Sequence, residues 1–345
     1  MSKRFRIAVI GCGEIAKRLH VPDYATCEDA EIVALCDLDV AKARELAQLW
    51  APDAAVYTDY KAMLRGGHID GVSVCLPNYL HAPVTLAALK SGCHVLVEKP
   101  MAASLAEAKS MNDAAKRAKR LLMVNQSQRR FAAHIKAREV LQSGMLGKVL
   151  QVSGMFGHQG PEHWSPTGKW FFDKKQARFG AMADLGVHKA DIIRFMTGKE
   201  VGEVSAVMGN LEKKGSTVDD NFCACFKFVD GTMGMFGASW TVKGMDCNYT
   251  LFHCENGSLR VHQIPDKPLV AHLLKPECTI EFPIEKPEYK YDGSWGIDVG
   301  GGFVRACLGK EAPFCTGEDG RKSLELILAA EKAALTGRAV KISHR

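Results

Sequence analysis

Ile7-Ala8-Val9-Ile10-Gly11-Cys12-Gly13-Glu14-Ile15-Ala16 is the stretch that decides the fold of this chain. Its apolar start predicts a short buried strand, and the glycines that follow predict a tight turn into a helix. The spacing Gly-x-Gly-x-x-Ala is typical of a dinucleotide-binding turn. Gly11 permits the turn, Gly13 lets the backbone approach a pyrophosphate, and the small Ala16 lets the helix pack closely on the strand. An ordinary strand–helix turn is the alternative for such a motif taken alone.

An acidic residue after the second apolar run supports the dinucleotide interpretation. Asp37 ends the strand-like run 32–36, about 24 residues after Gly13, where an acid that binds ribose hydroxyls is expected. A carboxylate repels a 2′-phosphate, and no Arg or Lys follows until Lys42. We therefore expect NAD rather than NADP as the cofactor. The contacts expected from this part of the chain are Gly11, Gly13, Glu14, Ile15 and Asp37.

The first third of the chain continues the same alternation. Apolar runs at 72–76, 94–97 and 121–124 are separated by helical patterns such as 40–50 and 83–90. Continuous apolar strands between helices indicate a parallel sheet that is covered on both faces. We therefore predict a dinucleotide-binding Rossmann domain over residues 1–124.

After about residue 150 the pattern changes to alternating, strand-like segments. The segments 222–229 and 232–240 flank Asp230-Gly231, a hairpin signal, and a strong late helix over 322–335 ends at Gly337. These features predict a second, sheet-rich domain with mostly antiparallel strands over residues 125–345. The last helix is the part expected to pack back on the first domain.

Composition bounds the function. The net charge is +6, from 45 basic and 39 acidic residues, too mild an excess to indicate a nucleic-acid binder. The twelve cysteines contain no Cys-x-x-Cys, so we expect reduced thiols and no metal site. The apolar run 7–10 is too short for a signal peptide, and no run of about 18 apolar residues occurs. We expect a cytoplasmic protein with no membrane segment.

Two further motifs carry groups suited to proton transfer. Glu98-Lys99-Pro100 closes a strand, and ligands of open α/β sheets bind at the carboxyl ends of strands, so Lys99 is expected beside the nicotinamide. A surface lysine before a turn proline is the alternative. Asp184 and His188 are four residues apart and share one face of a predicted helix. An imidazole there is able to accept a hydroxyl proton, although such a histidine is equally compatible with a structural role.

These motifs resemble those of a known family. The runs 11–13, 77–81, 92–100 and 184–188 occur in order, and together they are similar to the glucose–fructose oxidoreductase, inositol dehydrogenase and rhizopine catabolism (Gfo/Idh/MocA) family. The resemblance extends from about residue 5 to 316–320 and the helix after it. It implies a Rossmann domain, a C-terminal α/β domain with a large open sheet, and hydride transfer between a nicotinamide and a hydroxyl carbon of a sugar or cyclic polyol.

The resemblance also implies individual roles. It makes His188 the base, Asp184 a residue that orients the substrate hydroxyl, and Lys99 the group that holds the reacting oxygen or relays its proton. It implies a contact of Asn78 with the nicotinamide ribose. Further cofactor contacts are expected at Pro77, His81 and Glu98; His81 is equally suited to capping the next helix.

The sequence departs from the family where three glycines often stand, since it reads Phe179-Gly180-Ala181 there. Ala181 is expected to fit, whereas Phe179 is expected to narrow the pocket. The stretch 156–170 is rich in groups that hydrogen-bond hydroxyls or stack on sugar rings, although a packed loop explains it equally well. Candidate substrate contacts are His158, His163, Trp170 and, unless it is structural, Arg130.

Two rival functions remain open at this point. One is a glycoside hydrolase that keeps NAD bound and uses a transient oxidation. The other is a non-catalytic NAD-binding regulator, which has no need for Lys99, Asp184 and His188. The resemblance further implies a homodimer or homotetramer that pairs through the open sheet, and the run 232–236 has the apolar character for such a face.

Overall fold

The computed structural model describes residues 4–284 and 296–343, and these divide into two compact units. The first unit comprises the described chain up to residue 130 together with residues 296–321, and the second comprises 131–284 and 322–343. The boundary expected at residue 124 therefore falls a few residues later. Residues 296–321, expected in the second domain, belong to the first unit. The part of the second half of the chain that packs on the first unit therefore lies mainly before the last helix, not in it.

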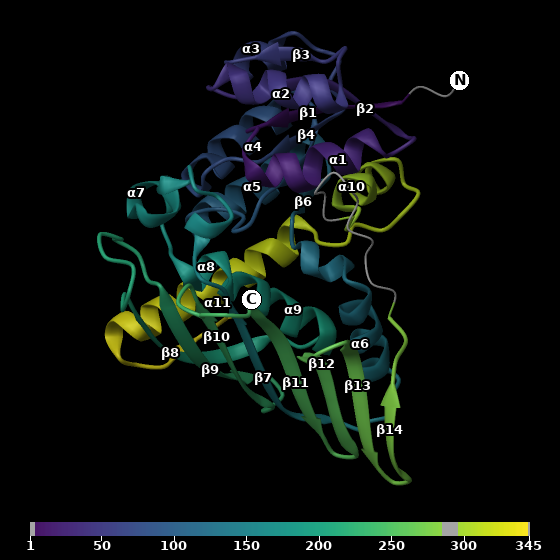
Figure 1. Ribbon diagram of the computed structural model, residues 1–345, viewed down its shortest axis with the longest axis vertical. Helices are drawn as coiled ribbons and strands as arrows, with labels where there is room; N and C mark the ends of the chain where they lie inside the picture. Colours follow the sequence, from purple (N-terminus) through teal and green to yellow (C-terminus); the bar gives the residue numbers. More distant parts are fainter. Residues whose placement is uncertain (1–3, 285–295, 344–345) are drawn as a thin grey trace. The chain divides into compact units, whose positions relative to one another are not determined.

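A six-stranded parallel sheet forms the centre of the first unit (Figure 1). The strand order is β3-β2-β1-β4-β5-β6, which is the Rossmann order and confirms the predicted fold. The sequence did not indicate β3, because this edge strand has three residues and no buried side chain. The strands are β1 (Phe5–Ile10), β2 (Ala30–Cys36), β3 (Ala55–Tyr57), β4 (Gly71–Val74), β5 (His94–Val97) and β6 (Leu122–Val124).

Short polar caps begin several helices of this unit. The Asp39 side chain accepts a hydrogen bond from the amide of Ala41 at the start of α2, and Ser104 accepts one from Glu107 at the start of α5. The helices are α1 (Val21–Ala25), α2 (Val40–Trp50), α3 (Tyr60–Arg65), α4 (His81–Lys90), α5 (Leu105–Ala118) and α10 (Val299–Cys307), with a π-helical turn η1 (Ala16–His20) and 3₁₀ turns η2 (Asn78–Leu80) and η3 (Ser127–Arg130).

Helix α10 joins the first unit through buried contacts. The Asp23 carboxylate accepts hydrogen bonds from the amides of Val299 at 2.6 Å and Gly300 at 3.1 Å. The ring of Phe303 lies edge-on to that of Phe5, with centroids 6.4 Å apart. Together these contacts satisfy the first free amides of α10 and bury its apolar side chains against β1 and α1.

The second unit is built on a nine-stranded sheet of order β14-β13-β12-β11-β7-β10-β9-β8-β15. All neighbouring pairs are antiparallel except β7 and β10, which confirms the expected mostly antiparallel sheet. Asp230-Gly231 forms the predicted hairpin turn, with Gly231 at φ +92°. The strands are β7 (Val149–Gly157), β8 (Val201–Gly209), β9 (Asn221–Phe228), β10 (Met233–Ser239), β11 (Cys247–Cys254), β12 (Gly257–Ile264), β13 (Lys267–Leu274), β14 (Glu277–Glu281) and β15 (Val340–Lys341).

Helices pack on one face of this sheet (Figure 1). They are α6 (Ala132–Gln142), α8 (Ala181–Asp184), α9 (Gly186–Thr197) and the larger part of α11 (Gly317–Thr336), while the short α7 (Lys174–Ala177) lies in the loop after β7. Apolar side chains on the other face are exposed, among them Val207, Met233 and Met235. Within the described residues, none of the helices is long and apolar enough to cross a membrane.

Candidate active site

The glycine turn has the backbone that its sequence predicts. Gly11 adopts φ +94°, and a Cβ there would lie 2.1 Å from the carbonyl oxygen of Cys75, so the chain itself requires glycine. A Cβ at Gly13, in contrast, would meet no atom within 4 Å. The protein leaves the space over Gly13 open, as a turn that receives a pyrophosphate requires. Beside it, Glu14 pairs with Arg18 at 2.9 Å and the partly buried Ile15 packs on the core.

The Asp37 carboxylate lies against this turn. Its Oδ2 accepts a 2.7 Å hydrogen bond from the amide of Cys12, and its Oδ1 accepts a 2.8 Å bond from the amide of Asp39. A carboxylate has about four acceptor positions, so two remain for hydroxyl groups. The next side chain, Leu38, is 90% exposed and brings no positive charge.

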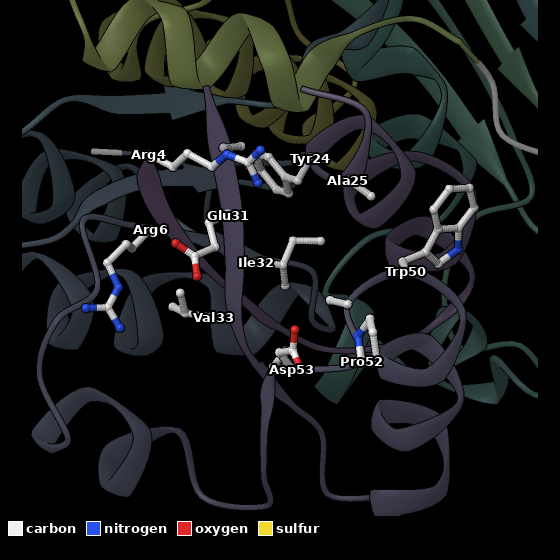
Figure 2. Close-up of a pocket in the computed structure, with 13 residues that line it drawn as sticks. Arg4, Arg6, Tyr24, Ala25, Glu31, Ile32, Val33, Trp50, Pro52 and Asp53 are labelled. Atoms are coloured by element: carbon white, nitrogen blue, oxygen red, sulfur yellow. The ribbon is translucent and has the colours of Figure 1, made fainter. Parts of the chain in front are cut away.

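A separate cavity of about 530 Å³ lies in the first unit (Figure 2). It is lined by residues of the amino-terminal halves of β1 and β2, among them Arg6 and Glu31, and by the segment from Trp50 to Ala54. The glycine turn and Asp37 follow the carboxyl ends of the same strands. Because ligands of open α/β sheets bind at the carboxyl ends, this cavity is not the predicted dinucleotide site.

Two of the predicted cofactor contacts, His81 and Glu98, are buried and hydrogen-bonded within the protein. His81 is fully buried, and its two ring nitrogens lie 2.8 Å from the carbonyl oxygen of Pro100 and 2.7 Å from that of Leu76, to one of which the neutral ring donates. Burial lowers the pKa of His81. The ring therefore ties two loops together. The alternative of a side-chain cap on the next helix is not what the structure shows, because α4 begins at His81 itself and has no side-chain cap. Glu98 is likewise buried, and its carboxylate is bonded within the protein, including to the amide of Lys99 at 3.1 Å.

The remaining predicted groups follow the ends of β4 and β5. Pro77 precedes the 3₁₀ turn η2, which begins at the buried Asn78. Lys99 follows Glu98 and is half-buried. The structure thus brings the glycine turn, Asp37, Asn78 and Lys99 to the carboxyl ends of neighbouring parallel strands, which is the edge where a dinucleotide is expected.

In the second unit, Asp184 and His188 lie on consecutive helices rather than on one. Helix α8 ends at Asp184 and α9 begins at Gly186, so the expectation of a single helix face was wrong. Both side chains are nonetheless more than nine-tenths buried. The ring of His188 lies 5.9 Å from that of Phe156, and Nε2 of His158 lies 3.9 Å from Oδ2 of Asp184. Two residues near the end of β7, Phe156 and His158, therefore lie beside His188 and Asp184, respectively.

Asp219, which the sequence did not single out, fixes the start of α8. Its carboxylate accepts hydrogen bonds from the amides of Gly180 at 2.9 Å and Met182 at 2.7 Å. Burial raises the pKa of Asp219 to about 6. A Cβ on Gly180 would lie 1.7 Å from the carbonyl oxygen of Asp219, so this position requires glycine. Ala181, which follows it, is fully buried.

Phe179 is buried and lies under the guanidinium of Arg178, whose carbon is 4.4 Å from the ring centroid. Arg178 in turn makes two hydrogen bonds to Glu331 on α11. These contacts show how the bulkier residue is accommodated within the second unit, namely as a packed side chain beneath an ion pair.

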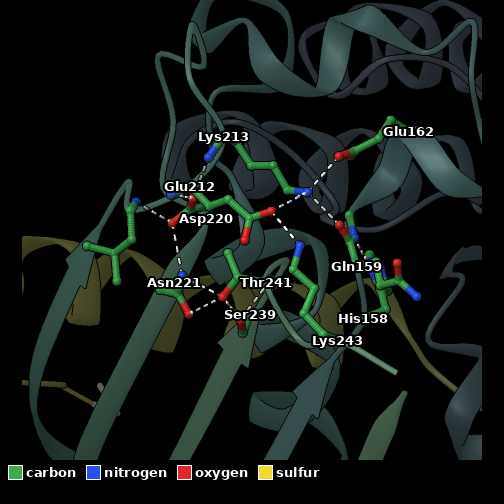
Figure 3. A network of polar contacts seen from close by, with 12 residues as sticks. His158, Gln159, Glu162, Glu212, Lys213, Asp220, Asn221, Ser239, Thr241 and Lys243 are labelled. Carbon is green, nitrogen blue, oxygen red and sulfur yellow. Dashed lines mark hydrogen bonds and ion pairs between the residues drawn. The ribbon is translucent and has the colours of Figure 1, made fainter. Parts of the chain in front are cut away.

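Figure 3 shows the polar network that holds the loop after β7. The ammonium of Lys213 donates to the Glu162 carboxylate at 2.6 Å and to the carbonyl of Gln159 at 2.5 Å. The fully buried Asp220 accepts from three successive amides, those of residues 211–213. Hydrogen bonds lower the pKa of Asp220, although its burial raises it. The loop that carries His158 is therefore anchored to the β8–β9 connection.

The other candidate substrate contacts are placed differently. His163 is exposed, and Trp170 stacks on Phe171 with ring centroids 3.9 Å apart. Arg130 is structural: within the first unit it pairs with Asp298 at 2.8 Å and Glu311 at 2.7 Å. All three of its hydrogen-bonding nitrogens are engaged, counting the bond to the backbone carbonyl of Ile297, which favours the structural role over the predicted substrate contact.

Sulfur and metal chemistry add no site in the described residues. All twelve cysteines are free there, and no group of three His, Cys, Asp or Glu side chains has the arrangement of a metal site. Burial raises the pKa of several of these thiols, including Cys12 to about 12. Such thiols stay protonated and serve as small apolar groups.

Comparisons with known proteins agree with this geometry. Residues 5–126 match the model of an oxidoreductase family with an NAD-binding Rossmann fold, GFO_IDH_MocA, and residues 134–260 match the GFO/IDH/MocA C-terminal domain. The chain is 29% identical to 1,5-anhydro-D-fructose reductase of Ensifer adhaerens over 83% of each protein. It is 26% identical to myo-inositol 2-dehydrogenase of Thermotoga maritima over 98% of this chain and 99% of that one.

Among solved structures, aldose–aldose oxidoreductase of Caulobacter crescentus, complexed with glycerol, superposes with a TM-score of 0.84 at 26% identity. That alignment covers 99% of this chain and all of the other. Since both family models match in order and together span most of the chain, this protein belongs to the Gfo/Idh/MocA family of NAD-binding oxidoreductases.

Proposed function

We propose that this enzyme oxidises a ring hydroxyl of a sugar or cyclic polyol with NAD and catalyses the reverse reduction. The observation that carries the proposal is the cluster at the end of β7, where the carboxylate of Asp184 and the imidazole of His188 lie beside His158 and Phe156. Polar groups that bind hydroxyls beside an aromatic face suit a polyhydroxylated ring. The named relatives act on compounds of this class, an anhydrofructose and an inositol.

The residues have separable roles in this proposal. His188 accepts the proton of the reacting hydroxyl, and Asp184 orients that hydroxyl and stabilises the imidazolium that forms. Lys99 holds the reacting oxygen or relays its proton. NAD, when bound, supplies the hydride acceptor. The turn at Gly11 and Gly13 and the carboxylate of Asp37 hold its phosphates and its adenosine ribose.

A substrate screen tests the proposal. The purified chain is incubated with inositols, hexoses, glycosides and sugar acids, each with NAD or NADP, and NADH or NADPH formation is followed by absorbance. We expect NADH with at least one free polyol. Cleavage of a glycoside without net NADH would instead identify the hydrolase mechanism, and binding of NAD with no turnover of any compound would identify a regulator.

We also propose a homodimer or homotetramer that pairs through the exposed face of the nine-stranded sheet. Apolar side chains on that face, Val207, Met233 and Met235, are 70%, 62% and 45% exposed. Light scattering should give a multiple of the 37.7 kDa chain mass at micromolar concentration. A mass equal to one chain would refute the proposal.

A further inference from the structure

A chain of buried polar side chains runs under the carboxyl ends of β4, β5 and β6. The Tyr24 hydroxyl is hydrogen-bonded to that of Ser73 at 2.6 Å, and Ser73 is bonded to Nδ1 of His20 at 3.0 Å. Nε2 of His20 is bonded to Oε1 of Glu98 at 2.8 Å. Asn125 donates to the same carboxylate oxygen at 2.5 Å. All five side chains are almost completely buried.

The position of His20 depends on an unusual turn. The helix that starts at the glycine motif is π-helical over Ala16–His20 before it continues as α1. A π turn inserts an extra residue into the helix, re-aims the side chains around it and is frequent at functional sites. Here the ring of His20, which is fully buried, bridges Ser73 on β4 and Glu98 after β5.

The network keeps a buried carboxylate charged. Burial raises the pKa of Glu98, but the hydrogen bonds and charge of His20, the Asn125 amide and the charge of Lys99 hold it below its usual value. An ionised carboxylate in such a place is strongly destabilising unless its oxygens are hydrogen-bonded. Oε1 is satisfied by His20 and Asn125, and Oε2 accepts from the amide of Lys99 at 3.1 Å.

Glu98 therefore connects two parts of the nucleotide-binding edge. On one side it is held by His20, which belongs to the helix that leaves the glycine turn. On the other it holds the backbone amide of Lys99. A carboxylate gripped from both oxygens has little freedom to rotate, so the backbone from which the Lys99 side chain extends is fixed relative to the glycine turn.

We propose that His20 is a positioning residue, which acts through Glu98 to fix Lys99 for proton handling. The inference rests on the function proposed for Lys99. A histidine that served only the packing of the core would stabilise the fold without affecting how Lys99 is placed. Misplacement of a catalytic group by about 1 Å can cost 10²-fold in rate, so a device of this kind is expected to affect turnover more than cofactor binding.

Three variants separate positioning from stability. H20L removes the hydrogen bonds of the ring to Ser73 and Glu98, and H20Q restores a donor near the position of Nε2. D23N is the matched control, because the buried carboxylate of Asp23, on the adjacent α1, is hydrogen-bonded to the amides of Val299 and Gly300. For each variant we would measure Tm, the NADH dissociation constant, KM and kcat on the best substrate of the screen.

We expect H20L to lower kcat by roughly 10–100-fold with little change in NADH affinity, H20Q to recover most of the loss, and D23N to lower Tm without lowering kcat. Equal kcat in H20L and wild type would overturn the proposal, as would a loss in H20L that D23N reproduces at matched Tm.

A second readout does not depend on turnover. Acetic anhydride labelling followed by mass spectrometry gives the acetylation rate of Lys99 alone. We expect H20L, but not D23N, to accelerate it several-fold, because the backbone of Lys99 is no longer held. An unchanged acetylation rate in H20L would overturn the positioning role. Absence of turnover of every compound in the screen would count against the proposed function instead, and it would leave this labelling test unaffected.

Discussion

The indole Nε1 of Trp240 donates a 2.9 Å hydrogen bond to Oδ2 of Asp184. Trp240 is fully buried directly after β10, and its backbone amide donates to the carbonyl of Asp220. One oxygen of the carboxylate is therefore held by a rigid aromatic side chain. This relationship defines which way Asp184 faces within the second unit.

Replacement of Trp240 by Phe removes this donor and keeps an aromatic ring. A hydrogen bond to a charged group is worth about 1.5–3 kcal/mol, so kcat/KM should fall by roughly 10-fold or more as Asp184 loses its orientation. Steady-state kinetics on the substrate found in the screen measures the effect. W50F, which changes a tryptophan of the first unit far from Asp184 in sequence, is the control. Equal losses in the two variants would contradict the prediction.

Replacement of His188 by Ala removes the proposed base. The loss of a general base costs about 10²–10⁴-fold in rate, so kcat should fall by that order. NADH affinity, measured by fluorescence titration, should stay near that of the wild type, because the phosphates are expected at Gly11 and Gly13. K99A should also lower kcat. If both variants kept near wild-type kcat on the true substrate, NAD binding without these catalytic roles would describe the chain better.

Exchange of Asp37 for Ser, combined with L38R, should move the cofactor preference from NAD toward NADP. The change removes the negative charge that repels a 2′-phosphate and places a cation at a 90% exposed position. The ratio of kcat/KM for the two cofactors is the measurement. L38R alone is the control and should shift the ratio less, because Asp37 still repels the phosphate. A wild-type enzyme that already prefers NADP would disprove the role of Asp37.

Lys189 should make stability depend on pH. The side chain is fully buried, its ammonium donates to the carbonyl of Tyr249 and the hydroxyl of Thr250, and burial lowers its pKa from 10.5 to about 7. Between these two values this site binds more protons in the unfolded chain than in the folded one, so Lys189 makes the free energy of unfolding rise with pH across that window.

K189M should make this slope less positive, because no proton is then released on folding at that site. Urea denaturation at several pH values between about 7 and 10 measures the midpoint for each protein. K174M, which changes an exposed lysine, is the control and should keep the wild-type slope. The same slope in K189M as in wild type would show that Lys189 keeps its ordinary pKa in the folded chain.

Sequence patterns predicted most of the first unit because they are local. Parallel strands buried on both faces read as continuous apolar runs, and the predicted helix over 40–50 matches α2 to the residue. The same holds for the hairpin at Asp230-Gly231 and for the helix end at Gly337, which adopts φ +66°. A glycine with positive φ is a property of the turn itself.

Long-range partners were beyond those patterns. Nothing in the local sequence showed that Arg130 pairs with Asp298 and Glu311, or that Asp219 caps α8. The break between α8 and α9 at Leu185 was equally hidden, because the spacing of Asp184 and His188 fits a continuous helix. The partners of Arg130 and of α8 lie far along the chain. At Leu185 the backbone departs from the continuous α-helix that the residue spacing predicts.

The sequence by itself determined the dinucleotide-binding turn, the parallel sheet behind it and the residue types available for hydride and proton transfer. Only the tertiary structure decided which of those residues are held by a hydrogen bond from a distant side chain. Asp184 is held by Trp240, and Glu98 is held by His20. The physical reason is that local backbone preferences act over a few residues, whereas a buried polar group is satisfied by whichever partner the packing brings within hydrogen-bond distance.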